Sequence, residues 1–199
     1  MSESAPLPDA SLDQLFRNAR SFNGWLDKDV REVEIAAIYD LMKMGPTAAN
    51  SHPGRFVWCK SVEAKQKLAD CAAENNKDKV LTAPVCVIVG MDNDFHEELP
   101  WLFPHADAKS WFDGKDAWRA ENAMRNATLQ GAYLMMAARA LGLDCGPMSG
   151  FDEEAVNKAF FADDAAVKAN FICSIGHGDP ASLFDRSPRP DFGTFNTVL

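Results

Sequence analysis

Apolar positions along the chain alternate between helical spacing and short continuous runs, which predicts a mixture of helices and strands. Residues 30–44 place apolar side chains at helical spacing, and Gly45 and Pro46 end this helix abruptly. Residues 61–74 predict a second helix, with Ser61 as its N-cap. Three short runs rich in β-branched or aromatic residues predict buried strands: residues 55–59, 85–91 and 171–175.

The longest predicted element is a helix over residues 123–141, which is apolar almost all the way round. Such a pattern favours a buried central helix or one that lies in a subunit interface. Gly142 ends this helix, residues 146–150 predict a tight polar loop, and Asp152 predicts the N-cap of a further helix. Because helices and strands do not alternate strictly, we expect an α+β fold with a mixed, mostly antiparallel sheet flanked by helices.

The composition narrows the class of protein. With 199 residues, 47% of them apolar and 25% charged, the chain suits one domain over residues 1–199, with residues 1–10 as a flexible tail. The net charge of -9 would repel nucleic acid, so we expect no nucleic-acid partner. The start of the chain lacks the features of a signal peptide, and no apolar run approaches the roughly 18 residues of a membrane span. A cytoplasmic protein without a membrane partner is therefore expected.

Cysteine and histidine spacing gives no sign of a disulfide framework or of a metal site. The five cysteines are irregularly spaced and contain no CxxC pair, so most are expected to be plain buried thiols. The four histidines lack the short, repeated spacing of metal ligands. The sequence therefore supports no metal.

Arginines near the two ends of this acidic chain are the first candidates for binding chemistry. Arg17 and Arg20 lie near the start, and Arg186 and Arg189 lie near the end. They are either solvated surface charges or a set that converges on one phosphate, which guanidinium groups bind bidentately. No GxGxxG motif follows the first strand, so a redox enzyme with this sequence needs a primary cofactor other than NAD on a doubly wound sheet.

Two loops of small and polar residues are further candidates. Residues 46–53 (PTAANSHP) form either an ordinary turn or a surface that brings hydroxyl, amide and backbone groups against a flat ring. Residues 146–150 (GPMSG) form either a simple connection or a rigid loop whose backbone N–H groups face an acceptor atom. The residues alone leave both alternatives open.

Taken in order, these blocks resemble the nitroreductase family: arginine-serine near the start, PTAANSHP, ALGLDCGPMSGF and paired arginines at the end. The segments LMKMGPTAAN, LTAPV, LPWLFPHADAKSWF, RNATLQGAYL and RALGLDCGPMSGFD look like the branch that reduces malonic semialdehyde to 3-hydroxypropionate in pyrimidine-ring breakdown. The similarity extends over about residues 12–192. It implies a homodimer of the family's α+β fold, with two FMN sites at the subunit interface and NAD(P)H as the reductant.

The resemblance also implies which residues hold FMN. Those that meet the phosphate or the polar edge of the ring are Arg20, Ser21, Asn23, Arg186 and Arg189. Those that lie along the ring are Pro147, Met148, Ser149 and Gly150, with the backbone N–H of Ser149 facing flavin N5. The partner chain contributes Thr47, Ala48 and Asn50. This sequence departs from the family pattern at Asn23, usually basic, at His52, usually glutamine, and at Ser149, often acidic.

The implied activity is a ping-pong transfer of hydride from NAD(P)H through FMN to a small acceptor. An aldehyde acceptor also needs a proton, for which His52, His105 and ordered water are the candidates. Lys109 or Arg125 would bind a substrate carboxylate, unless each is solvated or structural. The aromatic residues 99–112 form either a lid over the ring or packing under a long loop.

Three other functions remain open from the sequence. A broader nitroarene or quinone reductase would share the flavin chemistry and differ in its pocket. A flavin carrier or sensor would bind the cofactor without turnover. A globular domain without flavin would use the two loops as turns and the arginines as surface charges.

Overall fold

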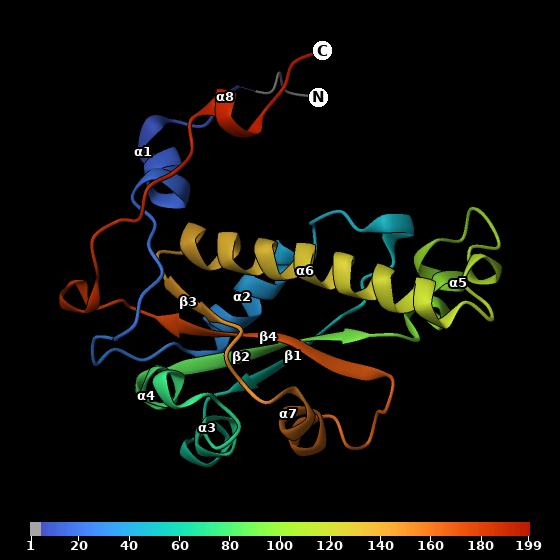
Figure 1. The fold of residues 1–199 in the computed structure, drawn as a ribbon, viewed down its shortest axis with the longest axis horizontal. Coiled ribbons are helices and arrows are strands. Elements are labelled where there is room, and N and C mark those ends of the chain that lie inside the picture. Colours follow the sequence, from blue (N-terminus) through green and yellow to red (C-terminus); the bar gives the residue numbers. More distant parts are fainter. Residues whose placement is uncertain (1–4) are drawn as a thin grey trace.

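A four-stranded antiparallel sheet lies at the centre of the structure, a computed structural model that describes residues 5–199. In chain order, the strands are β1 (Gly54–Cys59), β2 (Val85–Asp92), β3 (Asp144–Met148) and β4 (Val167–Gly176). They lie side by side in the order β1-β2-β4-β3, and each neighbouring pair is antiparallel. The predicted α+β fold is therefore confirmed (Figure 1).

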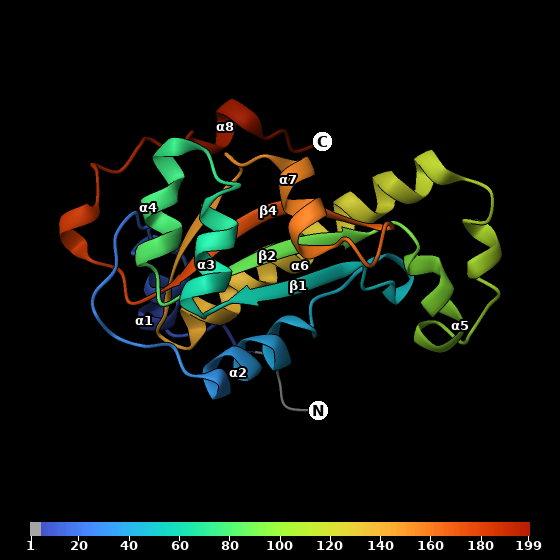
Figure 2. The same ribbon diagram turned by 90° about the horizontal axis from the view of Figure 1, so that it is seen from below.

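Helices cover both faces of the sheet (Figures 1 and 2). On one face lie α6 (Asp116–Ala140) and α2 (Glu32–Met42). On the other lie α3 (Val62–Ala69), α4 (Glu74–Thr82) and α7 (Glu153–Phe160). The shorter helices are α1 (Asp9–Leu12), α5 (Leu99–Leu102) and α8 (Phe192–Phe195), with single turns at Asp13–Arg17, Ala48–Asn50, Phe95–Glu98, Lys109–Trp111 and Pro180–Ser182.

The central strand β2 shows why its sequence is a continuous apolar run. Successive side chains of a strand point to opposite faces, and helices cover both faces here. Val85 and Val87 pack into the core beneath α2 and α6, whereas Cys86 and Ile88 pack into the core beneath α3, α4 and α7. Each of these four side chains is fully buried.

The predicted loop over residues 146–150 is wrong, because its first three residues belong to strand β3. Pro147 concealed the strand, since proline cannot donate a hydrogen bond within a sheet. β3 is an edge strand, however, and edge strands tolerate proline. Gly146 is required at this edge, because a Cβ atom there would lie 2.5 Å from the carbonyl oxygen of Phe22.

Other predicted boundaries differ less from the structure. The helix predicted over residues 61–74 ends at Ala69, and the separate helix α4 begins at Glu74. The predicted caps are confirmed, because Ser61 accepts from the Ala64 N–H and Asp152 accepts from the Ala155 N–H. Of the predicted flexible tail, residues 1–4 lie outside the described residues, and α1 already begins at Asp9.

No described helix combines the length and the apolar character that a bilayer crossing requires.

Candidate flavin site

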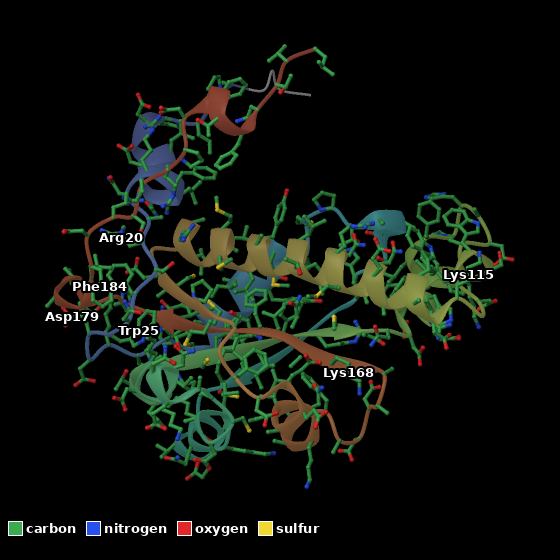
Figure 3. The ribbon with its side chains drawn as sticks, viewed as in Figure 1. Arg20, Trp25, Lys115, Lys168, Asp179 and Phe184 are labelled. Atoms are coloured by element: carbon green, nitrogen blue, oxygen red, sulfur yellow. The ribbon has the colours of Figure 1, made fainter. Side chains whose placement is uncertain are left out.

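Two segments near the ends of the chain, residues 19–22 and 184–186, lie side by side near the start of β3. Ser21 forms an isolated bridge with Cys145, and the Phe22 N–H donates to the Cys145 carbonyl at 3.0 Å. Arg20 donates to the carbonyl of Phe184 at 2.6 Å, and Arg186 donates back to the carbonyl of Ala19 at 3.1 Å. Figure 3 shows Arg20 and Phe184 at this edge of the molecule. These reciprocal bonds align the N-terminal and C-terminal segments.

A cavity of about 350 Å³ lies between the two aligned segments and the last turn of α6. It is lined by the five residues that were predicted to meet the phosphate or the polar edge of the ring: Arg20, Ser21, Asn23, Arg186 and Arg189. Arg139 of α6 and the acidic Asp185 also line it. The structure thus brings together residues that are more than 160 positions apart in the sequence.

The four guanidinium groups of this cavity outnumber its one lining carboxylate, that of Asp185. Within residues 5–199, none of the ion pairs involves Arg20, Arg139, Arg186 or Arg189. Their recorded hydrogen bonds go to backbone carbonyls instead. The Nε atom of Arg139 is buried and has no hydrogen-bond partner in the described chain. Such a set fits a phosphate, which accepts several charge-assisted hydrogen bonds at once.

A smaller cavity of about 280 Å³ is lined by residues of α6, β3 and β4 and by the residue after β3. Its lining consists of Met135, Pro147, Met148, Ser149 and Phe171. Met135 precedes Arg139 by one turn of α6, which is about 6 Å along the helix axis. The two cavities therefore suit an elongated ligand with an anion at one end and a flat, partly apolar body at the other. Gly150, also predicted to lie along the ring, is tied to α4 through its carbonyl, which accepts from Asn76 at 3.0 Å.

The loop with Thr47, Ala48 and Asn50 lies elsewhere, near the middle of α6. Asn126 anchors it, because its Oδ1 accepts from the Ala48 N–H at 2.8 Å. Asn126 and Arg139 are about 20 Å apart along the helix axis. Within one chain, the structure does not bring the loop to the guanidinium cavity.

The loop adopts a backbone that needs support from its surroundings. Ala49, Asn50 and His52 have φ angles of 50°, 52° and 40°. Residues other than glycine rarely take such left-handed conformations, and they persist where neighbouring contacts fix them. Two contacts come from α6, since Asn126 binds Ala48 and Gln130 Oε1 accepts from the Gly54 N–H at 2.7 Å.

Sequence reasoning missed Asn126, Gln130 and Arg139. Asn122, Asn126 and Gln130 recur every four residues on α6, and all three are at most 5% exposed. This buried polar row inside an apolar helix was the available signal. Arg139 was missed because it lies far from both chain ends, whereas Arg17, considered with the terminal arginines, instead pairs with Asp9 and Asp13 at 3.0 and 2.8 Å.

The candidate substrate cations lie in ion pairs away from the guanidinium cavity, Lys109 before α6 and Arg125 near its middle. Lys109 pairs with Glu97 at 2.7 Å, which raises the pKa of the lysine through the hydrogen bond to that carboxylate. Arg125 pairs with Glu121 one turn away on the same helix face. His105 is exposed, with its ring against that of Phe103. Residues 99–112 are at least partly packing, because Leu99, Ala108 and Phe112 are buried together with Phe95 and Ala123.

The cysteines are buried thiols with no sign of redox chemistry. All five are buried, and each sulfur is free of a disulfide. Burial raises the pKa of Cys59 to about 11 and that of Cys86 to about 12, so both remain protonated at neutral pH. Over residues 5–199, no group of three or more His, Cys, Asp or Glu side chains is arranged to hold a metal ion.

Comparisons with known proteins identify the family of the chain. The profile described as Nitroreductase family matches residues 3–177. A protein of Stenotrophomonas maltophilia named NADH dehydrogenase/NAD(P)H nitroreductase is 59% identical over 183 residues, which are 92% of this chain and 93% of that one. A Ralstonia pickettii protein with the same name, HadB, is 58% identical over 185 residues, covering 92% of this chain and 94% of its own.

Among solved structures, a nitroreductase from Exiguobacterium sibiricum in complex with FMN superposes with a TM-score of 0.84. It shares 19% of its residues with this chain, and the match covers all of both chains. At this identity the likeness concerns the fold.

Proposed function

Because the chain belongs to the nitroreductase family, we propose that it is an FMN-dependent oxidoreductase that uses NAD(P)H to reduce a small aldehyde, malonic semialdehyde. The observation that carries the cofactor assignment is the cavity in which four guanidinium groups outnumber one carboxylate, Asp185. A protein of net charge -9 concentrates positive charge there, where a phosphate would compensate it.

The linings of the two cavities support a proposal for the residues that hold FMN. Arg20, Arg139, Arg186 and Arg189 bind the phosphate, and Ser21 and Asn23 add neutral polar contacts. Pro147, Met148 and Ser149 support the ring, and the Ser149 backbone N–H orients it by a hydrogen bond. When bound, FMN supplies the hydride-accepting and hydride-donating chemistry. The chain contributes binding, orientation and the exclusion of water.

A second copy of the chain completes the site in this proposal. The solvent-facing side of α6 carries Trp118, Leu129 and Tyr133, each between 42% and 45% exposed. Between Arg125 and Arg139 this helix has no charged residue, although one side of it faces outward. An exposed face of this kind is typical of a subunit interface. Across such an interface, the partner's loop of residues 47–53 would reach the ring that its own chain cannot reach.

Malonic semialdehyde is proposed as the acceptor because of the sequence segments that resemble the semialdehyde-reducing branch, above all LPWLFPHADAKSWF and GPMSGFD. The first segment surrounds α5 and packs beside the loop, as the bond from Asn50 to the Leu102 carbonyl shows. A broad nitroarene or quinone reductase is the second candidate. The names of the relatives from Stenotrophomonas maltophilia and Ralstonia pickettii favour it.

The experiment begins with the absorption spectrum of the purified protein, before and after incubation with FMN. We expect flavin bands, rapid bleaching by NADH or NADPH without oxygen, and a dimer by analytical ultracentrifugation. Reoxidation by malonic semialdehyde should exceed that by nitrofurazone or a quinone in kcat/KM. The reverse order would favour the broad reductase, and bleaching without reoxidation by any acceptor would indicate a carrier. A colourless monomer that binds no FMN would refute the proposal.

A further inference from the structure

His52 lies in the middle of a chain of hydrogen bonds that joins α6, the loop of residues 47–53 and α5. The Gly54 N–H donates to Gln130 Oε1 at 2.7 Å, and Gln130 Nε2 lies 3.2 Å from His52 Nδ1. His52 Nε2 lies 2.7 Å from Asn50 Oδ1. Asn50 Nδ2 donates to the Leu102 carbonyl at 2.8 Å. Each of the three side chains, Gln130, His52 and Asn50, therefore makes one hydrogen bond to the group before it and one to the group after it.

Backbone groups at the two ends fix the direction of every bond. A backbone N–H can only donate, so the Gln130 atom facing Gly54 is the carbonyl oxygen. The amide nitrogen of Gln130 must then donate to His52 Nδ1, which therefore carries no proton. Because Nδ1 carries no proton, the neutral imidazole of His52 has its proton on Nε2, which donates to Asn50 Oδ1. The amide nitrogen of Asn50 is then placed to donate to the Leu102 carbonyl, which can only accept.

Protonation of His52 breaks this pattern. An imidazolium has a proton on both ring nitrogens and cannot accept from Gln130. If Gln130 turns its oxygen to the imidazolium, its amide group then faces the Gly54 N–H, and two donors oppose each other. One hydrogen bond is lost in either case. The loop that Gln130 and His52 hold in its left-handed conformation thereby loses support.

The surroundings also favour the neutral imidazole. Burial lowers the pKa of His52 below its ordinary value. The charged groups lining the same cavity of about 470 Å³ are Lys43 beyond α2, Arg55 of β1 and Glu98 before α5, with the phenol of Tyr39 beside them. Arg55 also donates to the His52 carbonyl at 3.1 Å and pairs with Asp92. Since Lys43 pairs with Asp40 and Arg55 with Asp92, burial is the cause of the lowered pKa of His52.

We propose that His52 is a positioning residue: held by Gln130, its Nε2–H locks the Asn50 carboxamide in one orientation, and its protonation removes the Gln130 bond that holds the imidazole, and with it the loop, in place. His52 thus acts on FMN binding through Asn50 and donates no proton to substrate, because its Nε2–H is held by Asn50. This inference rests on the proposed function in so far as Asn50 meets the flavin. The hydrogen-bond chain itself belongs to the protein without cofactor.

Nitrogen-15 NMR of histidine-labelled protein without FMN tests the hydrogen-bond chain directly. The His52→Gln variant assigns the His52 signals among the four histidines. We expect the Nε2–H tautomer at neutral pH. In Gln130→Glu, the new carboxylate should favour a proton on Nδ1, so the pKa of His52 should rise. An Nδ1–H tautomer in the wild type, or an unchanged titration in Gln130→Glu, would overturn the proposal.

FMN affinity as a function of pH tests the consequence for the cofactor. Loss of one hydrogen bond should weaken wild-type binding about fivefold between pH 7.5 and pH 5. His52→Ala should show a similar loss at pH 7.5. His52→Gln should restore it, because glutamine can accept from Gln130 and donate to Asn50 without titrating. An equal pH dependence in the wild type and His52→Gln would contradict the role of His52. If no variant binds FMN at any pH, the proposed function fails, and the NMR titration still decides the hydrogen-bond chain.

Discussion

The C-terminal end and the middle of α6 differ in how fully their polar side chains find partners within the chain. Near its C-terminal end, Arg139 joins three other guanidinium groups in a cavity that only one carboxylate, Asp185, also lines. In the middle, Asn126 and Gln130 hold the loop of residues 47–53 in a network where donors meet acceptors. In the proposed function a ligand completes the first region, whereas the hydrogen bonds of the second are satisfied within one chain.

This difference teaches which property a substitution should alter. Where like charges outnumber counter-charges, removing one charge should change the stability of the protein little. It should, however, strongly weaken the binding of an anionic ligand. Where buried amides satisfy each other, removing one leaves an unpaired donor or acceptor and costs stability whether or not a ligand is present. The two regions therefore predict opposite responses to mutation.

The largest effect is expected for Arg139→Ala. Loss of charge-assisted hydrogen bonds to the phosphate should weaken FMN binding about fiftyfold, as measured by fluorescence titration. The melting temperature of the protein without FMN should change little, because no carboxylate partner is stranded.

Lys158→Ala is the matched control for Arg139→Ala. It removes the same charge from an exposed position on α7, on the opposite face of the sheet. We expect its FMN affinity to remain within twofold of the wild type. If Arg139→Ala bound FMN as well as Lys158→Ala does, the guanidinium cavity would not be the phosphate site.

Asn126→Ala is expected to act on stability first. Asn126 is 2% exposed, and its removal deprives the Ala48 N–H of its acceptor and leaves a small cavity. We expect the free energy of unfolding in urea to fall by about 2 kcal/mol. Thr128→Ala, an exposed neighbour on the same helix, should cost under about 0.5 kcal/mol. Equal stability of the two variants would mean that the loop does not depend on the buried amides.

The sequence predicted the parts of the site that depend on local chemistry. The helix caps at Ser61 and Asp152 follow from side-chain type and position, and both are present. The strands β1 and β2 follow from short apolar runs, since covered strands need apolar residues on both faces. The resemblance to a family further named the terminal arginines, and the structure places Arg20, Arg186 and Arg189 around one cavity.

The sequence could not supply the parts that depend on position in space. Pro147 is a strand residue only because β3 lies at the edge of the sheet, which no local pattern reveals. Arg17 and Arg139 are both arginines on helical turns, yet only Arg139 faces the cavity. Asp9 and Asp13 upstream of Arg17 were a local sign of pairing, whereas the place of Arg139 depends on how α6 crosses the sheet.

The smallest effect, and the one that separates the two regions without FMN, is expected from inorganic phosphate. Bound to the guanidinium cavity with a Kd of about 10 mM, phosphate at about 50 mM would add roughly 1 kcal/mol of stability through mass action. For a chain of this size, that corresponds to a rise of about 3 °C in melting temperature.

Sodium chloride at equal ionic strength provides the control for general screening. Arg139→Ala should lose this rise, whereas Asn126→Ala should keep it from a lower starting temperature, because its defect lies about 20 Å away along α6. If phosphate raised all three proteins equally, its effect would come from the general exclusion of phosphate from protein surfaces, and the charged end of α6 would have no more affinity for an anion than the rest of the molecule.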